Sequence, residues 1–545
     1  MTGAEAFLAA LKAAGVDWVF CNPGTDFPPV IEALAAGAEA PRMAAILHEN
    51  VAVGMAHGYY LATGRPQAAM VHVNVGTANA LMGLVNAHRE QVPLLLAAGR
   101  TPVSESGRRG SRSDAIHWGQ EMFDQGGMLR EVTKWDYELR DGSTVGDLVG
   151  RALAVAMSPP RGPVYLSLPR EALAEPADAT VRPVPPATPA HPDPAAVATV
   201  AGRFAAAARP LVVTSRGGPE LFAALGDFAD RWATPVTQLR PSRLSLPIDH
   251  PLCTGTAHGP HLAEADLVLV LDTLVPWLPA GPSPAPDAFV VQVGADALHG
   301  GIPLRSFRAD LAVTADPAAF VRELDSALGA PDAAVAARRD RLVPAIAEAR
   351  RKDLAAAMPG PDGMDAMFVS RVLSDVLAGD GIVVSEVGAR PWPMDLPRWD
   401  SFFGPPISGG LGWGLPAALG VKLADPSRPV VATVGDGSYV FANPSACHQA
   451  AAALGLGLVT VVFDNGRWNA VAASTTRMYP GGAAAAADAV PLSGLGPRPD
   501  YVRLVEAYGG HGELVDRPDR LADALAAALE RAAAGTQSLI AVRTT

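Results

Sequence analysis

The sequence predicts an α/β fold of three units, each built on a doubly wound parallel sheet. Short apolar runs rich in β-branched residues alternate along the whole chain with helical patterns of roughly 10 to 15 residues. This alternation is typical of parallel strands joined by crossover helices. With 545 residues the chain is also too long for one hydrophobic core, which favours several units over one.

The first predicted unit spans residues 1–175. Its apolar run VDWVF precedes the turn CNPGTDF, a helix is expected around residues 52–62, and AAMVHVNV, PLLLAAG and GPVYLSLP follow as further strands. Residues 173–195 are rich in Pro and Ala, and such a composition predicts an extended, semi-rigid linker.

The second and third units are predicted at residues 195–330 and 363–545. The strands of the second are expected at PLVVTSRGG, DLVLVLD and FVVQVGAD, and those of the third at GIVVSEVG, PVVATVGDG and LVTVVFDN. A charged helical stretch that ends in Pro359-Gly360-Pro361 separates them. Residues 49–76 and 409–437 both read as a helix of small residues, a turn ending in Arg-Pro, a buried strand and a glycine, which indicates duplicated outer domains.

Composition and charge exclude several classes of partner. A net charge of −12 argues against nucleic-acid binding, which needs a basic face. The chain has no run of about 18 uncharged apolar residues, and its first residues do not resemble a signal peptide, so we expect no membrane partner and a cytoplasmic location. The three cysteines, Cys21, Cys253 and Cys447, lie far apart and predict neither a zinc site nor a disulfide framework.

The strongest chemical motif is Gly435-Asp436-Gly437-Ser438, followed after one helix (near residues 444–454) by Asp464-Asn465-Gly466. A right-handed crossover places Asp436 and Asn465 at the carboxyl ends of two parallel strands, where α/β sheets bind ligands. A carboxylate and an amide oxygen suit Mg²⁺, and glycine backbone can approach a diphosphate closely. The motif therefore predicts a site for Mg²⁺ and a diphosphate.

This arrangement resembles the cofactor motif of thiamine-diphosphate-dependent enzymes, and of the benzoylformate decarboxylase and acetolactate synthase group in particular. The resemblance covers essentially the whole chain and implies thiamine diphosphate and Mg²⁺ as cofactors. It implies Asp436, Asn465 and the backbone carbonyl of Arg467 as metal ligands. One departure is Asp464, which stands where the family has an asparagine, and this extra carboxylate either strengthens metal binding or faces away.

The resemblance also assigns roles to the three units, as an N-terminal pyrimidine-binding domain, a central domain and a C-terminal domain that binds diphosphate and Mg²⁺. Glu49, in Leu47-His48-Glu49-Asn50, matches the glutamate that hydrogen-bonds the cofactor's aminopyrimidine and promotes proton removal from the thiazolium. In Gly409-Gly410-Leu411-Gly412 the Gly409 carbonyl and the Leu411 amide would hold the aminopyrimidine. The full set of expected cofactor contacts is Asn22, Pro23, Gly24, Glu49, Asn79, Ser385, Gly409, Leu411, Gly435, Asp436, Gly437, Ser438 and Asn465.

Candidate substrate-side residues come from the same resemblance. His72 aligns with the active-site histidine of benzoylformate decarboxylase, Thr25 with a serine that binds the substrate carboxylate, and Gln120 or Glu121 with a substrate-contacting glutamine of the synthases. A histidine at this position can transfer protons near neutral pH. The second histidine of that decarboxylase is missing, because Pro279 and its neighbours stand there, with Trp277 close by. We expect His258 and His261 to be surface residues.

The implied function is decarboxylation of a 2-oxo acid through an enamine, with either aldehyde release or carboligation. Alternatives are an acetolactate-synthase-like carboligase, a 2-hydroxyacyl lyase, a catalytically inactive paralogue, and an NAD(P)-binding oxidoreductase suggested by the glycines at 409–414.

The family's site lies between two chains, so a homodimer is the implied minimum and a homotetramer is expected. The sequence does not assign FAD as a cofactor, because the central unit shows no motif for binding it. Cys447 and His448 are adjacent on a predicted helix and are not expected to form a dyad.

Overall fold

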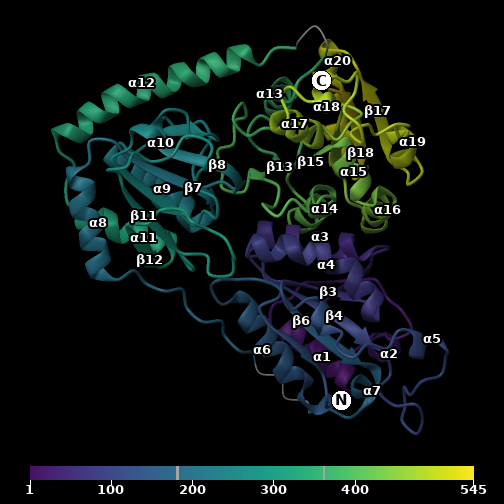
Figure 1. Ribbon diagram of the computed structural model, residues 1–545. Coiled ribbons are helices and arrows are strands. Elements are labelled where there is room, and N and C mark those ends of the chain that lie inside the picture. Colours follow the sequence, from purple (N-terminus) through teal and green to yellow (C-terminus); the bar gives the residue numbers. More distant parts are fainter. Residues whose placement is uncertain (179–182, 360–362, 545) are drawn as a thin grey trace.

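The computed structural model describes residues 1–178, 183–359 and 363–544, arranged as three lobes (Figure 1). The N-terminal lobe has one six-stranded parallel sheet in the order β2-β1-β3-β4-β6-β5. Its strands are β1 (Trp18–Cys21), β2 (Arg42–Ala45), β3 (Gln67–Val71), β4 (Leu94–Arg100), β5 (Asp136–Glu138) and β6 (Val164–Pro169). Its helices are α1 (Gly3–Ala13), α2 (Pro28–Ala35), α3 (Glu49–Thr63), α4 (Val73–Arg89), α5 (Ile116–Gly119), α6 (Val145–Met157) and α7 (Arg170–Ala174).

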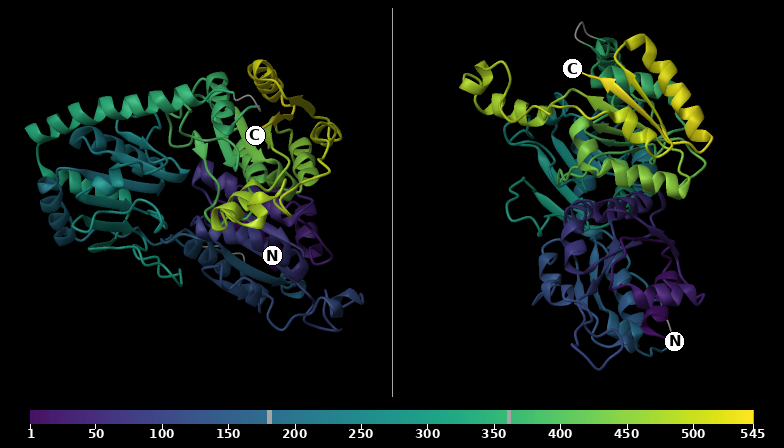
Figure 2. Two further views of the ribbon diagram at one scale, coloured as in Figure 1. Left: turned by 45° about the horizontal axis from the view of Figure 1, so that its top comes forward. Right: turned by 90° about the vertical axis from the view of Figure 1, so that its right-hand side faces the viewer.

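The middle lobe also carries a largely parallel sheet, with the long helix α12 running along its outer side (Figures 1 and 2). Its strands are β7 (Pro210–Arg216), β8 (Val236–Arg243), β9 (Cys253–Gly255), β10 (Leu267–Leu271), β11 (Phe289–Gly294) and β12 (Leu311–Thr314). Its helices are α8 (Pro194–Ala206), α9 (Pro219–Trp232), α10 (His261–Glu264), α11 (Pro317–Leu328) and α12 (Ala333–Ala356).

The C-terminal lobe continues the sheet of the middle lobe, because β14 pairs with β8 in an antiparallel bridge between Phe403 and Arg243. Together the two lobes form one twelve-stranded sheet. The C-terminal strands are β13 (Ile382–Glu386), β14 (Phe402–Phe403), β15 (Val430–Gly435), β16 (Val459–Asp464), β17 (His511–Val515) and β18 (Ser538–Arg543). The helices are α13 (Ala366–Leu377), α14 (Gly414–Ala424), α15 (Asp436–Phe441), α16 (Pro444–Leu454), α17 (Asn469–Met478), α18 (Ala483–Ala486), α19 (Tyr501–Glu506) and α20 (Pro518–Ala533).

The predicted α/β class is confirmed, and each apolar run named above forms a strand. The helix expected around residues 52–62 is α3, and that expected near residues 444–454 is α16. The sequence does not predict that the second and third sheets are joined. Residues 179–182 of the predicted linker, and Gly360 and Pro361 of the second boundary, lie outside the described residues. None of the helices in the described parts of the chain is long and apolar enough to cross a membrane.

Two buried helices, α3 and α14, join the N-terminal lobe to the C-terminal lobe (Figure 1). Residues of α3 from Glu49 to Leu61 are buried in an unbroken run, which is the pattern of a helix covered on all sides. The contact is close because each helix presents a glycine to the other's backbone. A Cβ atom on Gly58 would lie 1.9 Å from the Ala417 carbonyl oxygen, and one on Gly420 would lie 2.1 Å from the Met55 carbonyl oxygen.

A buried carboxylate, Glu90, ties all three lobes together just after α4. It accepts a hydrogen bond from the backbone N–H of Ile407 in the C-terminal lobe at 2.9 Å. Its other oxygen lies 3.7 Å from the guanidinium of Arg216, on β7 of the middle lobe, and Arg216 also pairs with Asp272 at 3.4 Å. Glu90 and Arg216 are both more than nine-tenths buried. The charge of Glu90 is thus compensated by groups of the two other lobes, whereas Arg216 also has Asp272 of its own lobe as a partner.

We predict that Gly58→Ala destabilises the protein by about 1–3 kcal/mol, because the added methyl group forces α3 away from α14. Gly202→Ala is the matched control: Gly202 is an exposed glycine within α8 whose Cβ would meet nothing within 4 Å. The control is expected to raise stability slightly, since alanine favours a helix over glycine by about 0.5–1 kcal/mol. Thermal unfolding midpoints of the two variants check this, and a midpoint for Gly58→Ala equal to or above that of Gly202→Ala would contradict it.

Candidate active site

Asp436 and Asn465 lie at one edge of the C-terminal sheet, as their positions after β15 and β16 predict. The two strands are adjacent and parallel, with Gly435 opposite Phe463. The Asp436 carboxylate is buried and accepts hydrogen bonds from the backbone N–H groups of Gly437 at 2.8 Å and Gly466 at 2.6 Å. Burial raises the pKa of this carboxyl group. A bound cation would offset the free-energy cost of ionising this buried carboxyl group, so the donor set fits a divalent metal.

Asp464, the departure from the family pattern, faces basic groups. Its carboxylate pairs with Arg543 and lies 3.3 Å from the Arg498 guanidinium. Asn465 in turn accepts a hydrogen bond from the backbone N–H of Arg467 at 3.0 Å through its side-chain oxygen. The extra carboxylate of Asp464 is therefore compensated by two arginines.

The segment Gly409–Gly412 lies against the N-terminal lobe just before α14. The side-chain amide of Asn50 donates to the Gly412 carbonyl at 3.2 Å, and that of Asn86 donates to the Gly410 carbonyl at 2.9 Å. Gly412 has φ of +85°, and a Cβ there would lie 2.4 Å from the Phe441 carbonyl oxygen. Leu411 stays partly exposed within this fixed backbone.

Glu386, at the end of β13, belongs to the predicted cofactor-binding loop at Ser385 and is a buried acid for which the sequence predicts no role of its own. Its carboxylate accepts hydrogen bonds from the backbone N–H groups of Gly412 at 2.8 Å and Gly414 at 2.6 Å. Burial raises the pKa of Glu386 to about 7, although these donors and the Ser438 hydroxyl oppose the rise. The neighbouring Ser385 hydroxyl donates to the Ala389 carbonyl at 2.9 Å. A carboxylate at the carboxyl end of a buried strand is the sequence signal that could have assigned a role to Glu386.

In the N-terminal lobe the structure gathers the predicted acid and base side chains near the start of α3 and the end of β3. Glu49 is buried and accepts a hydrogen bond from the Asn79 amide at 3.1 Å. His72 Nδ1 lies 2.5 Å from Asp26 Oδ1, and its Nε2 lies 3.2 Å from Gln120 Nε2. Asp26 was not predicted, although it directly follows the named turn residue Thr25.

The turn at residues 22–25 is fixed by backbone contacts. Asn22 donates its backbone N–H to the Met70 carbonyl at 2.9 Å and its side-chain amide to the Ile46 carbonyl at 2.8 Å. Thr25 is exposed, and its carbonyl accepts a hydrogen bond from Arg170 at 3.0 Å. The hydroxyl of Thr25 and the exposed Pro23 therefore line the surface of the turn. Within the described chain, no hydrogen bond or ion pair joins Glu49 to Asp436 or Asn465.

One expectation about the middle lobe is wrong. His258 is buried beside the backbone of Pro276, and burial lowers the pKa of its imidazole. His261 is half-buried. Trp277 is also buried and packs edge-to-face on Phe307, so it belongs to the core of the middle lobe.

Cys447 and His448 form no dyad, as predicted. The Cys447 thiol donates to the Ala442 carbonyl, whereas the His448 ring contacts Tyr439 and Gln537.

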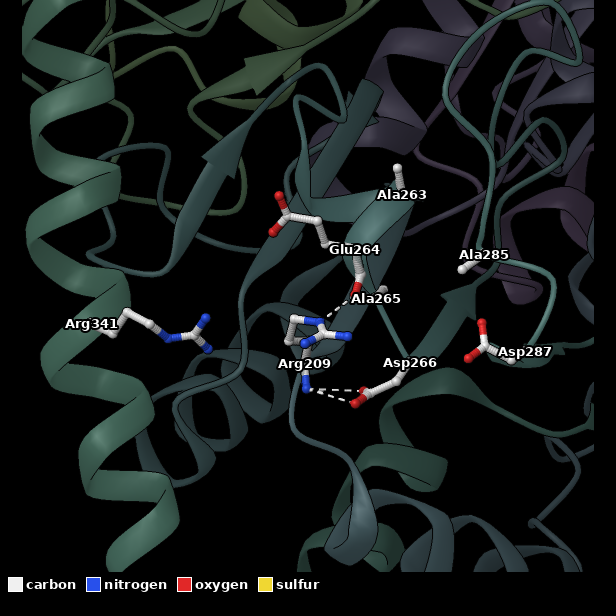
Figure 3. A pocket seen from close by; sticks show the side chains of 8 residues that line it. All are labelled: Arg209, Ala263, Glu264, Ala265, Asp266, Ala285, Asp287 and Arg341. Carbon is white, nitrogen blue, oxygen red and sulfur yellow. Dashed lines mark hydrogen bonds between the residues drawn. The ribbon is translucent and has the colours of Figure 1, made fainter.

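A hollow of about 290 Å³ opens elsewhere, at the amino ends of the middle-lobe strands (Figure 3). There the backbone N–H of Arg209 donates to the Asp266 carboxylate at 2.9 Å, and the Arg209 guanidinium donates to the Glu264 carbonyl at 2.5 Å. Parallel α/β sheets bind ligands at the opposite, carboxyl ends of their strands. We therefore place the candidate active site at the motifs described above.

Comparison with known proteins identifies the family. Residues 1–128 match the N-terminal TPP binding domain of thiamine pyrophosphate enzymes, and residues 388–542 match the C-terminal TPP binding domain. The chain belongs to the thiamine pyrophosphate enzyme family. The two matched regions contain the Glu49 and Asp436 motifs, respectively.

Comparison with individual relatives identifies the subgroup of this family to which the chain is similar. The chain is 30% identical to a benzoylformate decarboxylase of Pseudomonas aeruginosa over 504 residues, which is 85% of each protein. It is 25% identical to an acetolactate synthase large subunit of Lactococcus lactis, over 96% of this chain and 90% of the relative. A solved structure of a thiamine diphosphate-dependent 4-hydroxybenzoylformate decarboxylase from Rhodococcus jostii superposes with a TM-score of 0.80 at 25% identity, covering 100% of this chain and 99% of that one. This thiamine pyrophosphate enzyme is therefore one of the benzoylformate decarboxylase and acetolactate synthase group.

The raised pKa of Glu386 predicts a loss of stability as the pH rises. A carboxyl group whose folded pKa, about 7, exceeds its unfolded value is stabilised in its protonated form, so stability falls as the pH rises from about 4.5 through 7. Full ionisation would cost about 3 kcal/mol. We expect Glu386→Gln, which is neutral throughout, to show a flatter dependence of the unfolding midpoint on pH between 5 and 8. The exposed Glu32→Gln serves as control, and parallel curves for wild type and Glu386→Gln would show the prediction to be wrong.

Proposed function

We propose that this enzyme uses thiamine diphosphate and Mg²⁺ to decarboxylate a 2-oxo acid, and that it releases the product as an aldehyde or joins it to a second carbonyl compound. The observation that supports this most is the placement of a buried carboxyl group, Glu49, in the same part of the N-terminal lobe as a histidine paired with a carboxylate, His72. Proton removal and proton delivery in this chemistry need one group of each kind. Glu49 and His72 both lie in the N-terminal lobe, whereas the Mg²⁺ motif lies in the C-terminal lobe.

The residues present fit the two cofactors. Asp436, Asn465 and the Arg467 carbonyl would hold Mg²⁺, and the buried Ser438 hydroxyl and the glycines beside it would hold the diphosphate. When bound, thiamine diphosphate supplies a carbon nucleophile and an electron sink. Glu49 would exchange a proton with the aminopyrimidine ring, and the Gly409–Gly412 segment would orient that ring.

On the substrate side, the exposed Thr25 would bind the carboxylate of the 2-oxo acid through its hydroxyl, and His72 would deliver the proton that completes an aldehyde. Gln120 contacts His72, so it is placed to reach the same substrate. Glu121 instead pairs with Arg100 at 2.6 Å and with Arg112. We therefore assign the substrate-side role to Gln120.

Carboligation of the acetolactate synthase kind is the second candidate. It is supported by the similarity to acetolactate synthases and by the absence of a histidine at Pro279, the position of the decarboxylase's second histidine. A catalytically inactive protein is disfavoured, because Glu49, Asp436 and Asn465 are all retained. The NAD(P) reading is disfavoured because only the two-residue strand β14 precedes the glycines at 409–414.

We further propose that the enzyme is at least a homodimer, with Glu49 of one chain facing Asp436 and Asn465 of another, and that it assembles as a homotetramer in the cytoplasm. The three buried, free cysteines suit a reducing compartment.

We predict that Glu49→Gln reduces turnover at least about 100-fold, because an amide cannot exchange the proton that a carboxyl group exchanges. The measurement is carbon dioxide release from a panel of 2-oxo acids with thiamine diphosphate and Mg²⁺, with products identified as aldehyde or 2-hydroxy ketone. Glu32→Gln, an exposed glutamate of α2, is the control and should retain wild-type rates. Failure of the wild-type protein to release carbon dioxide from any acid would contradict the proposed decarboxylation.

Removal of divalent cations is expected to abolish binding of thiamine diphosphate, since the buried Asp436 carboxylate and a diphosphate would repel each other without a cation between them. Isothermal titration with thiamine diphosphate in EDTA, and again after addition of Mg²⁺, tests this. Asp436→Asn should weaken the Mg²⁺-dependent binding at least about tenfold. Equal affinity with and without the cation would contradict the proposed metal site.

A further inference from the structure

We propose that Asp26 is a positioning residue for His72, and that Gln120 adapts to both protonation states of the same ring, so that the three side chains act as one proton-transfer unit. The unit itself is inferred from contacts within this chain. Its use, as the source of the proton that completes the product, rests on the proposed function. Neither the sequence motifs nor the family comparison assigns a role to Asp26.

Asp26 fixes which nitrogen of His72 carries a proton in the neutral ring. Its Oδ1 lies 2.5 Å from His72 Nδ1, and Asp26 is only 3% exposed. An ionised carboxylate can only accept hydrogen bonds, so Nδ1 must be the donor. Nε2 is then the atom that gains and loses a proton, while the ring orientation stays fixed.

The same carboxylate also holds the backbone next to the histidine. Its Oδ2 accepts a hydrogen bond from the backbone N–H of Val73 at 3.3 Å. Val73 has φ of +35°, a conformation that β-branched residues rarely adopt. Such a residue persists only where its surroundings determine it. Asp26 thus binds both the ring and the unusual turn that points the ring out of β3.

Two glycines leave the room that this pair needs. A Cβ atom on Gly99, the second-last residue of β4, would lie 1.6 Å from Asp26 Oδ2. One on Gly24 would lie 2.2 Å from His72 Nδ1. A glycine inside a strand weakens the strand and often marks a close approach of another group. Here both glycines approach the same carboxylate–imidazole pair, so the backbone on two sides is shaped to hold it.

Gln120 provides for both protonation states of Nε2. With its amide nitrogen 3.2 Å from His72 Nε2 it donates to the neutral ring. Its amide oxygen is buried and has no hydrogen-bond partner among the described residues. Rotation of the amide by half a turn would bring that oxygen to Nε2, where it accepts a hydrogen bond from the protonated ring. The Gln120 amide oxygen therefore has no partner among the described residues beside the neutral ring because it serves as the acceptor when His72 is protonated.

The charges around His72 favour the protonated ring. The hydrogen bond to Asp26 raises the pKa of His72, the charges of Asp26 and Glu49 act in the same direction, and burial opposes them. In the proposed step the Nε2–H bond breaks, and the proton joins the electron pair left on the substrate-derived carbon when carbon dioxide departs. A C–H bond forms, and the neutral ring takes its next proton from water.

The test is a pH titration of the full-length protein without cofactor, labelled with ¹³C at histidine Cε1 and followed by NMR. His72→Asn identifies the His72 signal. Asp26→Asn is expected to lower the pKa of His72 by about one pH unit or more, because it removes the charge. Gln120→Glu is expected to raise this pKa by a similar amount. Asp227→Asn, an exposed residue of α9, should leave it unchanged.

Activity gives the second readout. With thiamine diphosphate and Mg²⁺, Asp26→Asn should lower kcat about tenfold or more with little change in KM, and its loss of activity at high pH should begin at a lower pH, in step with the NMR titration. A His72 pKa that is the same in wild type and in both variants would overturn the proposal. If the pKa shifts as expected but the wild type turns over no 2-oxo acid, the unit stands and the proposed function fails.

Discussion

The close packing of α3 on α14 is the constraint on which the rest of the molecule depends. Each helix starts at a segment of the candidate active site, because Glu49 is the first residue of α3 and the Gly409–Gly412 segment leads into α14. Backbone contact at Gly58 and Gly420 fixes how far apart these two starts lie. The bridging hydrogen bonds of Asn50 and Asn86 to the glycine segment depend on that spacing.

Buried carboxylates in the two outer lobes have different surroundings and so different roles. Asp26 faces an imidazole and a backbone N–H group, and it serves to hold a neighbouring side chain. Among the described residues the donors to Glu386 are neutral, including the backbone N–H groups of Gly412 and Gly414, and burial is the largest influence on its pKa. A third, Asp436, has backbone donors and a position suited to a cation. Local partners decide what each of these acids does.

Much of the fold could be predicted from the sequence, because buried parallel strands appear as continuous apolar runs and β3, β10 and β15 are of this kind. The convergence of Asp436 and Asn465 follows from the handedness of the crossover between their strands. Asp26 could not be predicted, because its partner is 46 residues away and the space between them depends on Gly99, on a third strand. Likewise, the bridge that joins the sheets at Phe403 is a single pairing with no sequence pattern, and the burial of His258 depends on a distant loop.

The contacts that Glu90 makes with the other two lobes limit which parts of this enzyme can be exchanged during evolution or by recombination. Its carboxylate comes from the N-terminal lobe, its guanidinium partner from the middle lobe and its backbone donor from the C-terminal lobe. A chimera that replaced the middle lobe alone, without an equivalent of Arg216, would leave a buried charge uncompensated, at a cost of about 3–5 kcal/mol. That amount is a large fraction of the stability of a typical domain, which is about 5–15 kcal/mol. The three lobes are therefore constrained to be inherited as a set, even where their separate sheets would tolerate exchange.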